Sequence, residues 1–278
     1  MTDSSYLTSH DGLTLPAVGF GTYQLKGEAG VGSILDAIDV GYRLLDSAFN
    51  YENEGTVGEA VRRTGVPREE LIVTSKLPGR HHAYELATQS IAESVFRTGL
   101  GYLDLHLIHW PNPKVGKYVE AWRAMIDARE AGLVRHIGVC NFEPEHLETL
   151  LAETGVLPSV NQIEVHPYFP NLEVIAWNRD HGIITEGWSP LGRGTQLLQE
   201  PVIVGIAERL GSDPAAVVLA WHRALGVLPL PKSGNRERQL ANLATSLVLS
   251  DDEVAQISAL ARPDGRTAGQ DPRTWEEF

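Results

Sequence analysis

The chain has 278 residues, of which 42% are hydrophobic and 21% charged, the balance of an ordinary globular protein. This length fits either one large α/β barrel or two ordinary domains. A formal net charge of -13 argues against a nucleic-acid partner, and no apolar run approaches the roughly eighteen residues that a membrane helix needs.

The first segment of the chain predicts a β-hairpin. Residues 1–9 lack the basic and apolar stretches of a secretory signal, so we expect none. Further along, Asp11 and Gly12 stand between apolar residues from Leu7 to Leu15, which is the turn chemistry of a tight hairpin. We expect this hairpin to form a small lid or plug.

After the hairpin, short apolar and β-branched runs alternate with helical patterns, which is the spacing of βα units. The expected strands are residues 18–21, 43–46, 71–75, 103–109, 136–140, 160–164, 183–188 and 227–230. The expected helices are residues 31–40, 54–63, 83–98, 119–131, 144–152, 172–180, 202–210 and 214–225, followed by 236–246 and 251–261. Asp213 before Pro214, and Ser250 before three carboxylates, are typical helix starts.

No linker or change of composition divides the chain. The pattern therefore predicts the α/β class, as a single (β/α)8 TIM barrel over residues 1–278 with an N-terminal β-hairpin and extra C-terminal helices. A doubly wound parallel sheet is the structural alternative.

In such a barrel the working residues lie at the carboxyl ends of the strands, where the βα loops meet. Nearly every expected strand has a polar or aromatic residue there: Asp46, Tyr51, Lys76, His109, Asn141, Gln162, Glu164, Trp188 and Lys232.

Three of these residues form a sensible proton donor. An ammonium beside Tyr51 stabilises tyrosinate and lowers the pKa of a phenol from about 10, while a carboxylate at Asp46 holds Lys76 in place. A neutral His109 imidazole can hydrogen-bond a carbonyl oxygen. This set suits carbonyl reduction, because the alkoxide made by hydride arrival needs a proton. The alternative is that Asp46 and Lys76 are a structural ion pair and Tyr51 packs at the barrel end.

The amino-acid sequence around these residues resembles that of the aldo-keto reductase family. Residues 41–48 (GYRLLDSA), followed by Tyr51, Asn53, Glu54, Val57 and Gly58, are similar to the family's signature around its catalytic aspartate and tyrosine. Residues 74–77 (TSKL) resemble the lysine segment and 104–111 (DLHLIHWP) the histidine segment. Residues 132–142, 161–167 and 231–233 also fit, so the resemblance runs nearly end to end. By its length and sequence the chain resembles bacterial 2,5-diketo-D-gluconate reductases within the family.

The resemblance implies a catalytic tetrad. Tyr51 would donate the proton, Lys76 would depress its pKa, Asp46 would anchor Lys76, and His109 would orient the carbonyl. The hydride would come from the nicotinamide of NADPH.

The resemblance also implies where the cofactor binds. Asn141 and Gln162 would hold the nicotinamide carboxamide, Trp188 would stack on the ring, and Arg238 beside Lys232 would favour NADPH over NADH. The expected cofactor residues are Gly21, Thr22, Cys140, Asn141, Gln162, Trp188, Ser189, Leu191, Gly192, Arg193, Lys232, Ser233, Gly234, Asn235, Arg238 and Asn242.

Some residues depart from the family pattern or from other cofactor folds. Cys140 stands where the family usually has a serine, before the asparagine, and its thiol offers only a weak hydrogen bond. The cysteine could act as a redox sensor or be an inert buried thiol. Gly19 and Gly21 lack the third glycine of a Rossmann fingerprint, so that fold is not supported.

The expected substrate wall consists of Tyr23, Phe49 and Trp110, and we expect no metal. The expected partner is a small carbonyl compound, with no nucleic acid and no membrane. Cys140, the only cysteine, cannot form an internal disulfide, which fits the cytoplasm. We expect a monomer, since no heptad seam is visible.

Two functional alternatives remain at this point. A metal hydrolase would use Asp104, His106 and His109, but strand alternation sends the first two to one face and His109 to the other. A barrel that binds NADPH as a redox sensor, with little turnover, is the second alternative, and the complete tetrad argues against it.

Overall fold

The computed structural model describes residues 6–243 and 246–278, and its centre is a sheet of eight parallel strands. The strands are β3 (Phe20–Gly21), β4 (Leu44–Asp46), β5 (Ile72–Leu77), β6 (Leu103–Ile108), β7 (Val134–Cys140), β8 (Val160–Glu164), β9 (Ile184–Trp188) and β10 (Val227–Pro229). Each strand pairs with the next along the chain. Hydrogen bonds of 3.1 Å from Gly19 N to Pro229 O and from Gly21 N to Pro231 O join the two ends of the sheet. The sheet is therefore a closed barrel, as predicted, and the doubly wound alternative was wrong.

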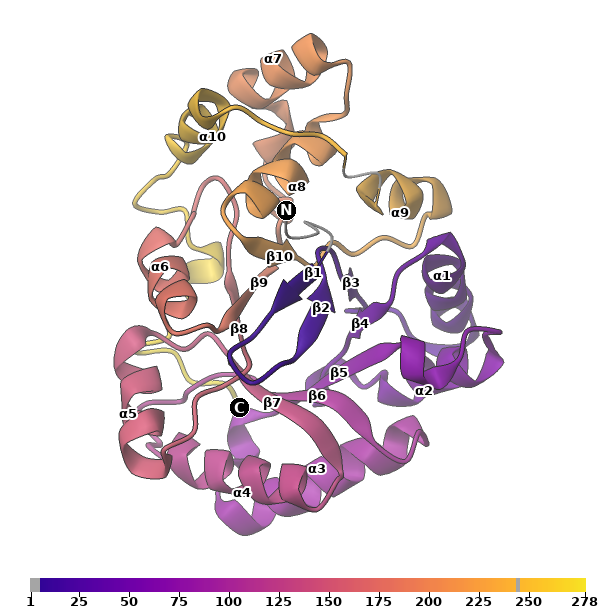
Figure 1. The fold of residues 1–278 in the computed structure, drawn as a ribbon, viewed down its shortest axis with the longest axis vertical. Coiled ribbons are helices and arrows are strands. Elements are labelled where there is room, and N and C mark those ends of the chain that lie inside the picture. Colours follow the sequence, from indigo (N-terminus) through magenta and orange to yellow (C-terminus); the bar gives the residue numbers. More distant parts are fainter. Residues whose placement is uncertain (1–5, 244–245) are drawn as a thin grey trace.

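Helices surround the barrel (Figure 1). They are α1 (Gly27–Val40), α2 (Glu54–Arg63), α3 (Tyr84–Thr98), α4 (Tyr118–Glu130), α5 (Pro144–Thr154), α6 (Leu172–Asp180), α7 (Pro201–Leu210), α8 (Pro214–Ala224), α9 (Arg236–Leu243) and α10 (Asp251–Ser258). Two predicted helix starts are confirmed: Asp213 Oδ1 accepts a hydrogen bond from Ala215 N at 2.8 Å, and Ser250 forms a capping box with Glu253. Within the described residues, no helix combines the length and apolarity needed to cross a bilayer.

The predicted boundaries agree closely for most elements. β8, α2 and α6 occupy the predicted ranges, whereas α1 begins at Gly27 instead of residue 31 because its first turn carries little apolar periodicity. β5 continues to Leu77, so that Lys76 lies inside a strand. The helix predicted over 236–246 is described as far as Leu243; residues 244 and 245 lie outside the described part, and Ser246 is not helical.

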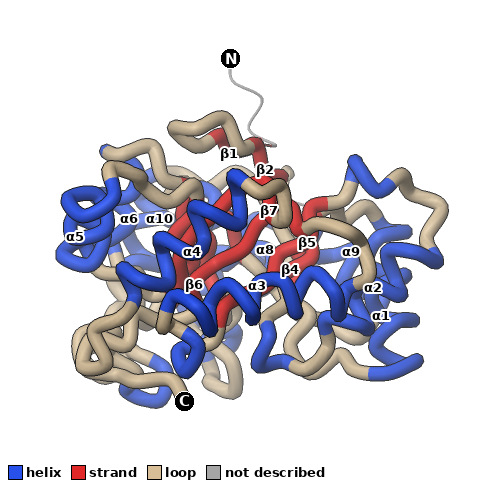
Figure 2. Tube along the Cα trace, turned by 90° about the horizontal axis from the view of Figure 1, so that it is seen from below, coloured by secondary structure: helices blue, strands red, loops and turns tan. Residues whose placement is uncertain are grey.

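An antiparallel hairpin of β1 (Tyr6–Thr8) and β2 (Thr14–Pro16) closes one end of the barrel. Its Leu13 and Leu15 are buried in a cluster with the inward-facing leucines of the strands. Figure 2 shows the hairpin at one end of the barrel and the C-terminal segment at the opposite end. The predicted plug is thus confirmed, and it leaves the carboxyl ends of the strands as the open end.

Candidate active site

The four predicted catalytic side chains meet at the open end of the barrel. Asp46 is the last residue of β4, Tyr51 ends the short 3-10 turn Phe49–Tyr51, Lys76 lies in β5, and His109 follows β6. Lys76 Nζ donates to Asp46 Oδ1 and Oδ2 at 2.6 and 2.7 Å and to the Ser47 carbonyl at 2.8 Å. Its distance to the Tyr51 hydroxyl is 3.5 Å. Strand order in the barrel brings these residues together, because β4, β5 and β6 are neighbours.

The charges in this cluster correct one expectation. Enclosure by the protein raises the pKa of Tyr51 to about 12, and the nearby ammonium of Lys76 offsets only part of that rise. The prediction that the pKa falls below its ordinary value of about 10 was wrong here, because burial of the phenol outweighs the Lys76 ammonium and the Asp46 carboxylate adds to the rise. Burial lowers the pKa of Lys76, but Asp46 and Tyr51 outweigh it and the net pKa is raised. At neutral pH the cluster therefore holds an ammonium, a carboxylate and a neutral phenol.

A buried carboxyl group that the sequence analysis missed lies behind the tetrad. Gln162 Nε2 donates to Asp46 Oδ1 at 2.9 Å and to Glu186 Oε2 at 2.7 Å. Burial, and then the charge of Asp46, raise the pKa of Glu186 to about 8. A usable signal existed, because residues 184, 186 and 188 of β9 alternate onto the same face and Trp188 was already placed there. Since both Gln162 N–H groups point at carboxyl groups, its amide oxygen is the atom available to a ligand.

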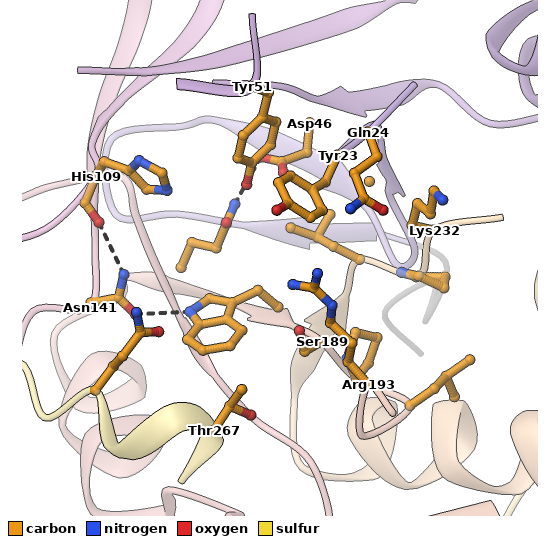
Figure 3. A pocket seen from close by; sticks show the side chains of 18 of the residues that line it. Tyr23, Gln24, Asp46, Tyr51, His109, Asn141, Ser189, Arg193, Lys232 and Thr267 are labelled. Carbon is orange, nitrogen blue, oxygen red and sulfur yellow. Dashed lines mark hydrogen bonds between the residues drawn. The ribbon is translucent and has the colours of Figure 1, made fainter. Parts of the chain in front are cut away.

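Two residues next to the site hold left-handed backbone conformations that residues other than glycine rarely adopt. Asn141 has φ +61° directly after β7, and Ser189 has φ +51° directly after β9. The Asn141 amide donates to the His109 carbonyl at 3.0 Å and accepts from Trp188 Nε1 at 2.8 Å. This places three predicted residues in one hydrogen-bonded chain across β6, β7 and β9 (Figure 3).

A cavity of about 600 Å³ opens in front of the tetrad (Figure 3). Predicted residues that line it are Gly21, Tyr23, Asp46, Tyr51, His109, Trp110, Asn141, Gln162, Trp188, Ser189, Leu191, Arg193 and Lys232. Lining residues that the sequence analysis missed are Gln24, Pro190, Leu230, Pro231, Thr267 and Gln270. The last two come from the segment after α10, where no periodic pattern gives a signal. The Arg193 guanidinium lies 4.9 Å from the centre of the Tyr23 ring, and both residues line the cavity.

Other predicted residues lie beside the cavity. Thr22 is buried and donates to the Asp46 carbonyl at 2.8 Å, Lys76 lies behind Asp46 and Tyr51, and Gly192 is in the loop after β9. Ser233, Gly234 and Asn235 directly precede α9, Arg238 lies in its first turn and Asn242 near its end, and none of the five lines the cavity.

Two predicted residues face elsewhere. The Cys140 side chain is buried among the barrel leucines, and burial raises the pKa of its thiol, which argues against a reactive thiolate. The side chain points inward because strand alternation gives the cavity to its neighbour Asn141. Phe49, expected in the substrate wall, lines a neighbouring cavity with Arg80 and Arg97.

The three side chains of the alternative metal site have separate partners. Asp104 pairs with Arg68 at 2.6 Å and Arg135 at 3.2 Å, and His106 Nδ1 lies 3.2 Å from a methionine sulfur. His109 Nδ1 lies 2.7 Å from the carboxylate of Glu277, a further residue that the sequence analysis missed. Within the described residues, no group of three or more histidine, cysteine or carboxylate side chains is arranged for a metal ion.

Comparison with known proteins identifies the family. Residues 17–262 match the profile of the aldo/keto reductase family. The chain is 52% identical over 273 residues to 2,5-diketo-D-gluconic acid reductase B of Corynebacterium sp. (strain SHS752001), with 98% of both chains covered. It belongs to the aldo/keto reductase family. It is also 39% identical over 274 residues to the methylglyoxal reductase DkgA of Escherichia coli (strain K12), again with 98% of both chains covered.

Solved aldo/keto reductases share the fold. The structure of Gox0644 in its apoform matches with a TM-score of 0.91 at 38% identity, covering 98% of both chains. A mutant of Gox0644 in complex with NADPH matches with the same TM-score, identity and coverage.

As an aldo/keto reductase with reductase relatives, the protein is an NADPH-dependent oxidoreductase that reduces carbonyl compounds, which was the activity expected from the sequence. The resemblance noted in the sequence is thereby confirmed. The alternative of a redox sensor with little turnover is not favoured, since both of these relatives are named reductases.

Proposed function

We propose that this aldo/keto reductase reduces aldehydes, ketones and α-dicarbonyl compounds through Tyr51 as the proton donor. The observation that supports this proposal is a series of contacts beside the cavity: Lys76 Nζ hydrogen-bonds the Asp46 carboxylate and also contacts the Tyr51 hydroxyl. When bound, NADPH would supply the hydride for the carbonyl carbon. Tyr51 then transfers its proton to the carbonyl oxygen, and Lys76 stabilises the tyrosinate that remains until a proton returns from solvent.

The residues present suit NADPH in their chemistry. The amide oxygen of Gln162 faces the cavity near Tyr51, and the aromatic ring of Trp188 lines the same wall. At the other end of the cavity lie the cations Arg193 and Lys232, with Arg238 beyond them, in a chain whose formal net charge is -13. Cations gathered in an acidic protein are suited to phosphate groups, and Arg238 is assigned to the 2′-phosphate that distinguishes NADPH from NADH.

The substrate class follows from the relatives and from the cavity wall. Two relatives are named for 2,5-diketo-D-gluconic acid and for methylglyoxal, both of which carry two carbonyl groups. Tyr23 and Trp110 offer aromatic surface in the cavity wall, while Thr267 and Gln270 offer hydrogen bonds to a polar substrate. We assign small dicarbonyl compounds to this site.

We also propose a domain organisation, an oligomeric state and a cellular location for the protein. Residues 1–278 act as one barrel domain, and a monomer suffices because all four tetrad residues come from one chain. The cytoplasm fits a buried free thiol and a cofactor held in reduced form.

The test is Tyr51→Phe, which removes the hydroxyl and keeps the ring. General acid catalysis contributes about 10²- to 10⁴-fold, so kcat for methylglyoxal reduction falls by that factor while the NADPH Kd stays within about twofold. Tyr23→Phe is the matched control, because its ring packs 5.0 Å from that of Tyr51 in the same cavity. Near-normal kcat in Tyr51→Phe, measured by NADPH oxidation at 340 nm, would refute the assignment.

A further inference from the structure

The C-terminal segment inserts a carboxylate beside the tetrad. Glu277 Oε1 lies 2.7 Å from His109 Nδ1 and accepts a hydrogen bond from Asn50 Nδ2 at 2.8 Å. Its Oε2 accepts from Gly79 N at 2.8 Å. These donors stand on the three loops that follow β4, β5 and β6, the strands that position Asp46, Lys76 and His109. One carboxylate thus connects the loops around the proton-transfer site.

The backbone holds Glu277 in this place. Its N–H donates to Asn112 Oδ1 at 3.0 Å, and its carbonyl accepts from Asn112 Nδ2 at 2.7 Å. A Cβ on Gly79 would stand 2.3 Å from the same Asn112 nitrogen and 2.6 Å from the Glu277 carbonyl oxygen. The glycine therefore leaves the space that the segment occupies. The Glu277 side chain is only 13% exposed, so the contact with His109 is shielded from water.

The contact decides which nitrogen of His109 carries a proton. Burial raises the pKa of Glu277, but His109, Gly79 and Asn50 outweigh this and lower it to about 2, so the group is ionised at neutral pH. Nδ1 is buried, and although its contact with Glu277 is not aligned as a hydrogen bond, an ionised carboxylate 2.7 Å away, which can only accept, favours the proton on Nδ1. Nε2 of a neutral ring is then an acceptor, and it becomes a donor only when the ring is doubly protonated.

We propose that Glu277 is a positioning residue that holds His109 with Nδ1 protonated, so that the ring donates a hydrogen bond to the substrate carbonyl through Nε2 as an imidazolium. This inference rests on the proposed function of Tyr51 in carbonyl reduction. The imidazolium replaces the neutral imidazole expected from the sequence. A positively charged donor polarises the carbonyl more strongly than a neutral one. Other charged or titratable groups face this pair: Tyr51 at 6.0 Å between ring centres, Lys76 and Asp46 beyond it, and His82 beside Glu277.

The first experiment reads the protonation of His109 directly in the wild-type protein. Two-bond 1H–15N NMR spectra of the histidine rings, with the His109 signals assigned by their loss in His109→Asn, are recorded across pH 5 to 9. We expect Nδ1 to carry a proton at every pH, and Nε2 to carry one as well where the ring is an imidazolium. A neutral His109 with its proton on Nε2 would overturn the inference. This readout needs no activity, and it stands even where a variant fails to fold.

The second experiment compares Glu277→Gln with Glu276→Gln. Glu276 is the neighbouring carboxylate, and its Oε1 accepts from Lys114 N at 2.6 Å, away from His109. In Glu277→Gln the imidazolium loses its counter-ion, so kcat at pH 8 falls about tenfold and the decline of kcat/KM begins at lower pH, while the NADPH Kd changes less than about twofold. Glu276→Gln should keep the wild-type profile.

The outcomes separate the two proposals. Identical pH profiles for the two glutamine variants, in an enzyme that reduces carbonyls and depends on Tyr51, overturn the role of Glu277 alone. Full activity of Tyr51→Phe overturns the proposed function, and the NMR result on the His109 ring is then still interpretable.

Discussion

Glu186→Gln tests the buried cluster behind the tetrad. Glu186 is completely enclosed in the barrel, its Oε2 accepts from Gln162, and in the described part of the chain its Oε1 meets no hydrogen-bond donor. The rise of its pKa from 4.5 to about 8 means that the folded protein keeps the proton where an unfolded chain releases it. A glutamine has the shape of the protonated acid and never ionises.

The size of the effect follows from linkage. The stabilisation is fully present below pH 4.5, is lost as the pH rises towards 8, and stays lost above it, because the unfolded chain binds fewer protons in that window. At 1.36 kcal/mol per unit, the shift corresponds to roughly 5 kcal/mol, an upper figure since the cluster can relax. Glu186→Gln should therefore match the wild type in stability at pH 4 to 5 and exceed it at pH 9, by up to about 10 °C in Tm.

The assay is thermal unfolding followed by circular dichroism from pH 4 to 9. Glu208→Gln, an exposed position on α7, is the control and should show a difference from wild type that does not vary with pH. An unchanged stability difference between Glu186→Gln and wild type across the whole range would refute the reasoning, because it would mean that Glu186 is ionised in the folded protein.

Two further predictions concern the cofactor and the packing of the helices. Arg238→Ala should weaken NADPH binding roughly 10- to 100-fold and NADH binding little, since a charge-assisted hydrogen bond to a 2′-phosphate contributes roughly 1.5–3 kcal/mol. Equal losses for both nucleotides, measured by fluorescence titration, would contradict this assignment. Arg236→Ala is the control, because Arg236 pairs with Asp36 and Asp39 on α1. Gly58→Ala should cost about 3 kcal/mol of unfolding free energy or more, because its Cβ would stand 1.8 Å from the Thr98 carbonyl oxygen. Gly32→Ala, with open space around it on α1, should be neutral or stabilising, and equal urea midpoints for the two variants would contradict the packing argument.

The fold could be predicted because the signals that define it are local. Most strands are short apolar runs, most helices show a 3.6-residue period, and the alternation of the two predicts a parallel α/β fold, with the doubly wound sheet as the alternative to a barrel. The end of each strand then gives the position of a site residue. This is why the sequence alone predicts that Asp46, Lys76 and His109 lie together.

What the sequence could not give depends on contacts between distant segments. Glu277 and Thr267 come from a region without periodicity, and only the folded chain brings them to His109 and to the cavity. The pKa of Tyr51 was misjudged for a similar reason. Pairing the phenol with Lys76 alone ignores the enclosure of the ring and the Asp46 carboxylate, both of which raise its pKa.

A pKa of about 12 for Tyr51 nevertheless suits a proton donor. It keeps the phenol protonated throughout the physiological range, whereas a strongly lowered pKa would leave part of the enzyme as tyrosinate with no proton to give. The acceptor in the reaction is an alkoxide, which is a much stronger base than a phenolate, so transfer remains downhill. Lys76 then matters less for acidifying the resting phenol than for keeping burial from raising its pKa further, since without the ammonium the tyrosinate would face Asp46 alone.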